Sequence, residues 1–296
     1  MKVVLLGKDG QVGWELQRAL APIGEVVALG QAEADFADIP ALLARVAGER
    51  PDVVVNAAAY TAVDKAESEP EMAARINAEA PAALAGLCAG SGAWLVHYST
   101  DYVYDGQSPA AYVETAQTGP LSVYGRTKLA GDLGVSGSGC KHLIFRTSWV
   151  FAARGGNFAK TMLRLAAERE VLNVVADQYG APTSAELIAD VTALCLHRVL
   201  HGADGASLSG LYHLVAAGEA TWFDYARHVI AGAAARGVAL KVSADAVKPI
   251  PASAYPLPAA RPANSRLSVR KLETAFGLHM PDWRLHVDRM LDEILG

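Results

Sequence analysis

The chain has few cysteines, no run of basic residues and no long uninterrupted apolar stretch, and each shortage excludes a class of protein. Its three cysteines, Cys88, Cys140 and Cys195, are odd in number and widely spaced. They fit neither a disulfide framework nor a zinc site, and they are typical of a reducing compartment. We therefore predict a cytoplasmic protein without structural disulfides.

Charge and hydropathy argue against nucleic acid and membrane as partners. The 296 residues carry a net charge of −5 at pH 7, which does not suit a phosphate backbone. Proline and glycine interrupt the uncharged span 80–96, so it predicts a helix, a turn and a strand in place of a membrane span. The N-terminal run 2–7 leads directly into a glycine turn, which is not the pattern of a signal peptide.

Short, nearly continuous apolar runs alternate with longer helical patterns. Such runs are typical of strands covered on both faces, and the alternation predicts a parallel sheet with helices on either side. Strands are expected at 2–7, 25–29, 52–58, 93–99, 142–148 and 210–215. Helices are expected at 11–21, 40–49, 70–90, 120–135, 157–169, 184–200, 221–236 and 284–295. The proline-rich segment 248–267 is expected to form an ordered loop.

This pattern predicts the α/β class, with a Rossmann-like, doubly wound parallel sheet and a smaller C-terminal substrate-binding domain. We expect residues 1–150 to form a dinucleotide-binding domain, rejoined by parts of 184–236. Residues 151–296 are expected to form mainly the substrate domain. The length of the chain suffices for both.

A glycine turn follows the first expected strand. Gly7, Gly10 and Gly13 are spaced three apart and open the first helix. Missing side chains allow a tight turn and let a diphosphate approach the free amides of the helix N-terminus. Because this GxxGxxG pattern stands inside a βαβ unit, it predicts dinucleotide binding.

The end of the second strand leaves the choice between NADPH and NADH open. An acidic residue usually stands there when the 2′-hydroxyl of NAD is bound. Here Gly30 and Gln31 occupy that place, with Glu33 and Asp35 further on and no Lys or Arg before Arg45. We expect the kcat/KM values for the two cofactors to have a ratio near one.

Tyr124 and Lys128 lie four apart in a helical pattern, so their side chains share one helix face. An ammonium near a phenol is expected to lower the phenol pKa from its ordinary value of about 10. Tyr124 would then protonate a carbonyl oxygen as hydride reaches the carbon. Ser99, Thr100 and Asp101 follow the fourth strand, at the sheet edge where open α/β folds bind ligands.

Together these motifs resemble the extended short-chain dehydrogenase/reductase superfamily, and within it the dTDP-4-dehydrorhamnose reductase family. The resemblance runs nearly from end to end through "GKDGQVGWELQRALAP", "VVNAAAYTAVDKAESEP", "HYSTDYVYDG", "YGRTKLAG", "FRTSWVF", "NFAKTMLRLA", "DQYGAPT" and "RPANSRL". It implies reduction of the C4 ketone of dTDP-4-dehydro-L-rhamnose to dTDP-L-rhamnose by NADPH or NADH, in a homodimer.

The resemblance also implies roles for individual residues. Tyr124 would be the proton donor, Lys128 would bind the nicotinamide ribose and assist Tyr124, and Thr100 would supply the hydroxyl that serine supplies in relatives. The expected cofactor-binding residues are Gly7, Gly10, Gln11, Val12, Gly13, Asp35, Phe36, Ala59, Tyr60 and Thr61, together with Tyr124 and Lys128.

The expected substrate-binding residues come from several segments. They are Thr100, Asp101, Trp149, Asn157, Lys160, Arg261 and Asn264. Asp101 and Trp149 match family positions that contact the sugar. A diphosphate needs cations or N–H donors, which Lys160, with Arg164 on the same helix face, and the proline-rich loop could supply. A solvated basic stripe is the alternative for the helix pair, and a core role is the alternative for Trp149.

A magnesium site is implied by the resemblance alone. Some family members bind magnesium at a dimer contact through three carboxylates, which match Glu15, Glu186 and Glu293. Carboxylates suit a hard cation. The eight histidines are scattered without ligand spacing, so zinc is not expected.

Two other functions remain alternatives. A nucleotide-sugar epimerase shares the glycine turn and the Tyr–Lys pair but regenerates its nicotinamide within each cycle. A non-catalytic regulatory subunit of the same fold would not need the full set of Thr100, Tyr124 and Lys128. The intact set favours the reductase.

Overall fold

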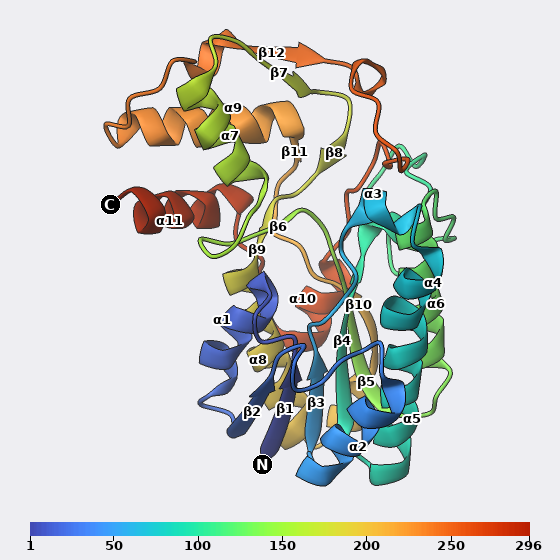
Figure 1. Ribbon diagram of the computed structural model, residues 1–296. Coiled ribbons are helices and arrows are strands. Elements are labelled where there is room, and N and C mark those ends of the chain that lie inside the picture. Colours follow the sequence, from blue (N-terminus) through green and yellow to red (C-terminus); the bar gives the residue numbers. More distant parts are fainter.

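Six parallel strands form the central sheet of the computed structural model, which describes residues 1–296 (Figure 1). They are β1 (Lys2–Leu6), β2 (Glu25–Leu29), β3 (Val53–Asn56), β4 (Trp94–Thr100), β5 (Lys141–Thr147) and β10 (Gly210–His213). Their order is β10-β5-β4-β3-β1-β2, and every neighbouring pair is parallel. The chain winds outward in both directions from β1 and β3, which confirms the predicted doubly wound α/β fold.

Apolar side chains cover both faces of this sheet. Successive residues of a strand point to opposite faces, so Val3 and Leu5 join one core cluster and Val4 and Leu6 join another. The first cluster includes residues of α1 (Gln11–Leu20), α8 (Ala185–His201) and α10 (Arg270–Phe276). The second includes residues of α2 (Ile39–Glu49), α5 (Ala80–Ser91) and α6 (Val123–Ser136). Burial on both faces explains why the strands are continuously apolar in sequence.

The crossover from β3 to β4 contains a short helix followed by a continuous helical run with one irregular turn. The short helix α3 (Val63–Ala66) precedes α4 (Pro70–Ala74), and α4 continues through a π-helical turn (Arg75–Glu79) into α5. The sequence predicted one regular helix over 70–90. The π-helical turn is therefore a difference, and such turns are frequent at functional sites.

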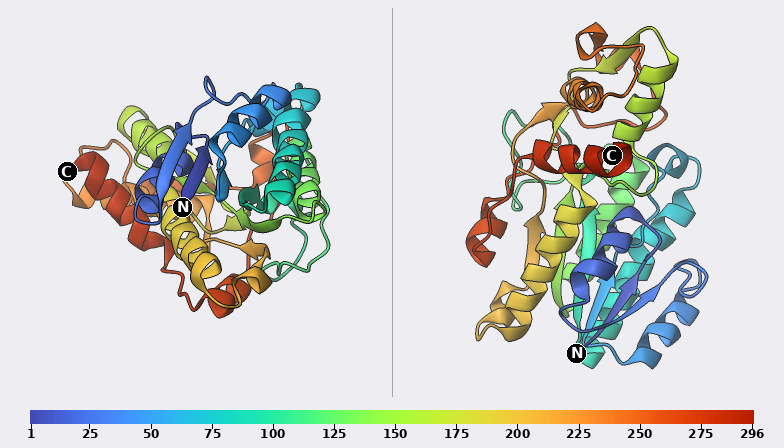
Figure 2. Two further views of the ribbon diagram at one scale, coloured as in Figure 1. Left: turned by 90° about the horizontal axis from the view of Figure 1, so that it is seen from below. Right: turned by 90° about the vertical axis from the view of Figure 1, so that its left-hand side faces the viewer.

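A smaller lobe lies beyond the carboxyl ends of the strands (Figures 1 and 2). It contains α7 (Phe158–Glu168), α9 (Trp222–Ala235), and the parallel pair β7 (Leu172–Val175) and β12 (Val247–Ile250). These elements share an apolar cluster of their own, with Met162, Ile230 and Val247 among its members. Two further pairs of very short strands are β6 (Val150–Phe151) with β9 (Thr183–Ser184), and β8 (Tyr179–Gly180) with β11 (Ala220–Thr221). These strands are too short to produce a periodic signal in the sequence.

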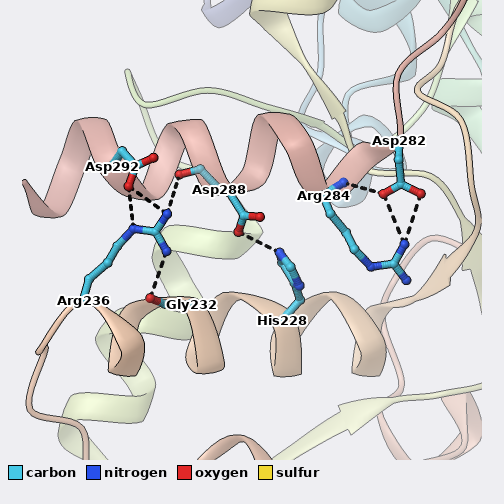
Figure 3. Close-up of polar contacts among 7 residues, drawn as sticks. All are labelled: His228, Gly232, Arg236, Asp282, Arg284, Asp288 and Asp292. Carbon is cyan, nitrogen blue, oxygen red and sulfur yellow. Dashed lines mark hydrogen bonds and ion pairs between the residues drawn. The ribbon is translucent and has the colours of Figure 1, made fainter.

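The C-terminal helix α11 (Trp283–Leu295) joins the smaller lobe to the main core. It packs against α9, and Trp283 and Leu291 are buried in the same cluster as Val3 and Leu5. Polar contacts align α11 with α9: the Nε of Arg236 donates to Asp292 at 2.8 Å, and the His228 ring contacts Asp288 at 2.9 Å (Figure 3). Because these pairs are partly exposed, they orient the helix more than they stabilise it.

The proline-rich segment 248–267 is a loop over most of its length, as predicted. Its first residues instead extend β12, where Pro249 stands opposite Val174 of β7. A two-stranded pair has a free edge on each strand, and an edge tolerates a proline without an N–H.

None of the helices combines the length and the apolar character that crossing a membrane requires.

Gly131→Ala in α6 is expected to destabilise the protein, whereas Gly86→Ala in α5 is expected to stabilise it. A Cβ at Gly131 would lie 2.2 Å from the carbonyl oxygen of Asn77, but one at Gly86 would have nothing within 4 Å. We expect a loss of about 1–3 kcal/mol in unfolding free energy at Gly131 from overpacking. At Gly86 we expect a gain of about 0.5–1 kcal/mol from helix propensity. Chemical denaturation measures both, and a gain at both positions would contradict the close approach of α6 to the π-helical turn.

Candidate active site

The predicted glycine turn connects β1 to α1 at the carboxyl edge of the sheet. Gly7 has φ +84°, and a Cβ there would lie 2.7 Å from the amide nitrogen of Ala58, beyond β3. A Cβ at Gly13 would lie 2.0 Å from the carbonyl oxygen of Gly7. Both glycines are therefore required for the close packing of the turn, and the turn lies in the crevice between β1 and β3 where the winding direction changes.

The N-terminus of α1 offers free amides beside that crevice. Gly10 caps the helix without a side chain, so no side chain occupies the first-turn N–H groups. Such a terminus favours an anion, and the glycine cradle therefore fits the diphosphate of a dinucleotide. Gln11, in the same turn, accepts a hydrogen bond from Asn157 at 3.4 Å, which brings a predicted cofactor residue next to a predicted substrate residue.

Asn77 fixes the segment after β3, and it was not predicted from the sequence. Its side-chain oxygen accepts from the Tyr60 amide at 2.8 Å, and its side-chain nitrogen donates to the Tyr60 carbonyl at 3.1 Å and to Thr127 at 3.2 Å. Asn77 is fully buried within the π-helical turn. It therefore links the segment with Ala59, Tyr60 and Thr61 to α6, which carries the Tyr–Lys pair.

Helix α6 places Tyr124 against the end of β4. The Ser122 hydroxyl caps the helix by accepting from the Gly125 amide at 3.1 Å. A Cβ at Gly125 would lie 2.3 Å from the carbonyl oxygen of Tyr102, so this glycine allows the helix to approach the turn after β4. The rings of Tyr102 and Tyr124 meet edge to face at 5.6 Å. The Thr100 hydroxyl lies close enough to the Tyr124 phenol to lower its pKa.

The expected acidity of Tyr124 is wrong for this structure. Burial raises the pKa of its phenol above the ordinary value, and the nearby Asp101 and Asp132 act in the same direction. The Thr100 hydroxyl opposes this rise but does not cancel it. Lys128 is not among the groups that shift the pKa of Tyr124, and its ammonium donates to the Tyr98 carbonyl. Tyr124 is therefore protonated at neutral pH, which is the state that a proton donor needs.

Lys128 is almost completely buried, with 2% of its surface exposed. Its Nζ donates to the backbone carbonyl of Tyr98 in β4 at 2.6 Å. Burial lowers the pKa of the Lys128 ammonium to about 8, and the carboxylate of Asp132 opposes that change. The two residues are separated by one turn of α6.

A chain of buried polar groups continues behind Lys128. Asp132 accepts from the Nε of Arg146 at 3.0 Å, in an ion pair with almost no exposed surface. Arg146 also donates to the Tyr104 hydroxyl at 2.8 Å, and that hydroxyl contacts the Nε2 of His213 at 2.8 Å. Burial lowers the pKa of His213 to about 3, so its ring is neutral. An unpaired charge buried here would destabilise the fold, and these linked polar groups supply a partner for each charge.

Asp101 and Trp149 border the same sheet edge. Asp101 accepts from the Thr100 hydroxyl at 3.0 Å, and burial raises the pKa of its carboxyl to about 6. Trp149 follows β5 with φ +48°, a strained conformation for a bulky residue. Its ring stacks on Trp222 of α9 at 3.6 Å, and Gly180 leaves room for it on another side. Strain of this kind is concentrated at ligand sites.

The predicted diphosphate residues are already engaged in contacts within the chain. Lys160 donates to the Ala153 carbonyl at 2.7 Å, while Arg164 is exposed and paired with Glu168. The guanidinium of Arg261 makes two bonds to Asp64, at 2.6 and 2.7 Å, which link the proline-rich loop to α3.

The structure speaks against Asn264 as a substrate ligand. Its side-chain nitrogen donates to the carbonyls of Ser108 and Ala110, both at 2.8 Å. Its oxygen accepts from the amide and Nε of Arg266. The side chain has therefore no hydrogen-bonding capacity left.

Asp35 and Phe36 occupy the turn between β2 and α2. Phe36 is buried in the core cluster beneath α2, and Asp35 accepts from the Ala37 amide at 2.9 Å. The Phe36 side chain therefore faces the core, away from the crevice.

The predicted magnesium residues do not form a metal site. Glu15, Glu186 and Glu293 come close enough to influence one another, since the latter two help to raise the pKa of Glu15. Glu186 is engaged by two bonds from Arg289, and Glu15 is paired with Arg18. No group of three His, Cys, Asp or Glu side chains is arranged to hold a metal ion. The magnesium prediction is therefore not supported.

Comparisons with known proteins extend over the whole chain. The family model described as RmlD substrate binding domain matches residues 1–295. The dTDP-4-dehydrorhamnose reductase of Salmonella typhimurium is 52% identical over 298 residues, which cover 99% of this chain and 98% of that protein. The reductase of the same name from Burkholderia thailandensis is 50% identical, with full coverage of both chains.

Solved structures show the same likeness. The crystal structure of a dTDP-4-dehydrorhamnose reductase from Clostridium acetobutylicum has a TM-score of 0.90 at 33% identity and full coverage of both chains. The reductase from Bacillus anthracis, solved in complex with NADP, has a TM-score of 0.87 at 34% identity, with 99% of each chain covered. By its family match, its half-identical relatives and its fold, this chain belongs to the dTDP-4-dehydrorhamnose reductase family.

Proposed function

We propose that this protein reduces the C4 ketone of dTDP-4-dehydro-L-rhamnose to the hydroxyl of dTDP-L-rhamnose, with NADPH or NADH as the reductant. One observation supports the proposal most directly: Tyr124 of α6 lies beside Thr100 of β4, and Lys128 of α6 donates to Tyr98 of the same strand, at the sheet edge that also holds the glycine turn. The relatives that are half identical over their full length carry the name of this activity.

Tyr124 is the proton donor in this proposal. When bound, the reduced nicotinamide supplies the hydride that adds to C4. The Tyr124 phenol gives its proton to the carbonyl oxygen, so that the ketone becomes an alcohol and no charge remains on the sugar. Tyr124 as a whole residue is only partly buried. The neighbouring Thr100 hydroxyl favours the phenolate that donation leaves behind.

Lys128 and the helix N-terminus serve the cofactor. The Lys128 ammonium is held against the end of β4, where it would bind the nicotinamide ribose. The free amides of α1 and the glycine cradle would bind the diphosphate.

The two parts of the fold divide the ligands between them. We assign residues 1–150, rejoined by α8 and β10, to the cofactor, and the smaller lobe to the sugar nucleotide. Trp149, Asn157, Lys160 and Arg261 lie on or near the boundary of that lobe and are the proposed substrate residues, together with Asp101. The homodimer and the cytoplasmic location remain predictions.

The direct test measures nicotinamide absorbance with the 4-keto sugar nucleotide. We expect one NADPH or NADH to be oxidised for each sugar that is reduced. An epimerase would show no net change in cofactor, and a regulatory subunit would show no reaction, so either result would reject the proposal. The same sugar carrying UDP in place of dTDP then measures selectivity for the base.

Tyr124→Phe is expected to lower kcat by a factor of about 10²–10⁴, because it removes the proton donor, with little change in cofactor affinity. Tyr102→Phe is the matched control, since its ring contacts Tyr124 without donating to the ketone, and it should keep most of its kcat. Near-normal turnover of the Tyr124→Phe enzyme would refute the assigned role.

The pH dependence of kcat/KM reports the ionisation of the free enzyme. Burial lowers the pKa of Lys128 to about 8, so its ammonium is present below that pH and is lost as the pH rises through it. We therefore expect kcat/KM to fall by about tenfold per pH unit above 8. Lys128→Arg keeps its charge at these pH values, and an unchanged alkaline limb in that variant would show that another group causes the fall.

A further inference from the structure

The indole of Trp149 is held between the two parts of the fold. Trp149 follows β5 of the main sheet, and the amide of Thr183 in β9 donates to its backbone carbonyl at 3.2 Å. Its φ of +48° is unfavourable for a bulky residue, so contacts with the surrounding structure must maintain this conformation. One of these contacts comes from Trp222 of the smaller lobe.

Trp222 covers one face of the Trp149 indole. The two rings stack with their centroids 3.6 Å apart and an angle of 13° between their planes. The ring of Phe158, at the start of α7, lies 4.7 Å from that of Trp222. Phe158 and Trp222 both pack against the main core cluster and against the cluster of the smaller lobe. The stack therefore ties Trp149 to the packed interior of the smaller lobe.

Trp222 is itself fixed as the first residue of α9. The residues on either side of it form a capping box, in which the Asp224 amide donates to the Thr221 hydroxyl at 3.0 Å. The Thr221 amide donates in return to the Asp224 carboxylate at 2.9 Å. Because this box satisfies two amides of the helix terminus, it defines where α9 begins and where Trp222 stands.

Gly180 leaves the space that the edge of the indole occupies. A Cβ at Gly180 would lie 2.7 Å from Cε2 and 3.0 Å from Nε1 of Trp149. Gly180 belongs to β8 and stands opposite Ala220 of β11, two residues before Trp222. One pair of short strands therefore positions both surfaces that hold the indole.

We propose that Trp222 is a positioning residue for the substrate, which acts by holding the Trp149 indole in place beside the sugar. Trp149 stands two residues after Thr147, the partner of Thr100 in the neighbouring strand, so it lies at the sheet edge of the proposed site. An indole that is already fixed there loses little conformational freedom when the sugar binds, which favours binding. This inference rests on the proposed function for the identity of the sugar nucleotide.

The sugar is the part of the ligand that this role concerns. If Trp222 only filled the interior of the smaller lobe, its replacement would disturb every ligand of that lobe alike. A residue that acts through Trp149 affects the sugar and spares the nucleotide. The ligands dTDP and dTDP-L-rhamnose differ in the sugar, so their comparison separates the two roles.

Equilibrium binding of these two ligands in the presence of NADPH tests the proposal. No turnover occurs, because NADPH and the sugar are both already reduced. Trp222→Leu should weaken dTDP-L-rhamnose by about three- to tenfold, since binding must then order a loosened indole, and leave dTDP nearly unchanged. Trp222→Phe keeps a ring for the stack and should retain most of the affinity.

Phe223→Leu is the matched control. Phe223 is the next residue of α9 and packs against the cluster of the smaller lobe, but it is not part of the cluster that includes Trp149. Its replacement should leave both ligands nearly unchanged. The unfolding free energies of Phe223→Leu and Trp222→Leu, measured by chemical denaturation, should be comparable, so that lost stability does not explain lost sugar affinity.

A double-mutant cycle shows whether Trp222 acts through Trp149. In a Trp149→Ala background, Trp222→Leu should have no further effect on dTDP-L-rhamnose, because the indole that it positions is gone. Near-UV circular dichroism adds a readout that needs no ligand. Two stacked indoles couple their transitions, so Trp149→Ala and Trp222→Leu should each remove the same signal.

Equal weakening of dTDP and dTDP-L-rhamnose by Trp222→Leu would overturn the inference, because it would show a general disturbance of the smaller lobe. An unchanged affinity for dTDP-L-rhamnose, or additive effects of the two tryptophan replacements, would overturn it as well. A wild-type protein that binds neither dTDP nor dTDP-L-rhamnose would reject the proposed function itself, which separates the two failures.

Discussion

The buried ammonium of Lys128 is the constraint on which the arrangement of the site depends. A cation with so little contact with water must be paired within the protein. The Tyr98 carbonyl and the carboxylate of Asp132 provide that pairing, and Arg146 holds Asp132 in turn. These partners come from β4, α6 and β5. Pairing the Lys128 ammonium therefore fixes β4, β5 and α6 relative to one another. This arrangement places Tyr124 beside Thr100.

The close approach of α6 to its surroundings has a cost in helix propensity. Gly125 and Gly131 weaken an isolated helix, but each allows backbone contact that no larger residue could make. The π-helical turn of Asn77 meets α6 at Gly131 and hydrogen-bonds to Thr127, the neighbour of Lys128. The sequence of α6 therefore has a lower helix propensity than it could have, but its glycines allow the close packing that positions Tyr124 and Lys128.

The fold could be predicted from the sequence because continuous apolar runs and helical periods are local signals. The six strands of the sheet and the main helices agree with the predicted ranges within a few residues. The spacing of Tyr124 and Lys128 likewise placed both on one helix. Properties that depend on contacts between distant segments could not be predicted. The pKa of Tyr124 depends on burial, and the hydrogen bonds that saturate Asn264 depend on Ser108 and Ala110. Asp132 could have been found, since it stands four residues after Lys128.

The position of α11 couples the smaller lobe to the stability of the sheet. Trp283 and Leu291 belong to the same apolar cluster as Val3 and Leu5 of β1. Detaching α11 would expose apolar surface of that shared core to water, which is unfavourable. Local opening of α11 would therefore weaken the support of the sheet as well as the packing of the smaller lobe.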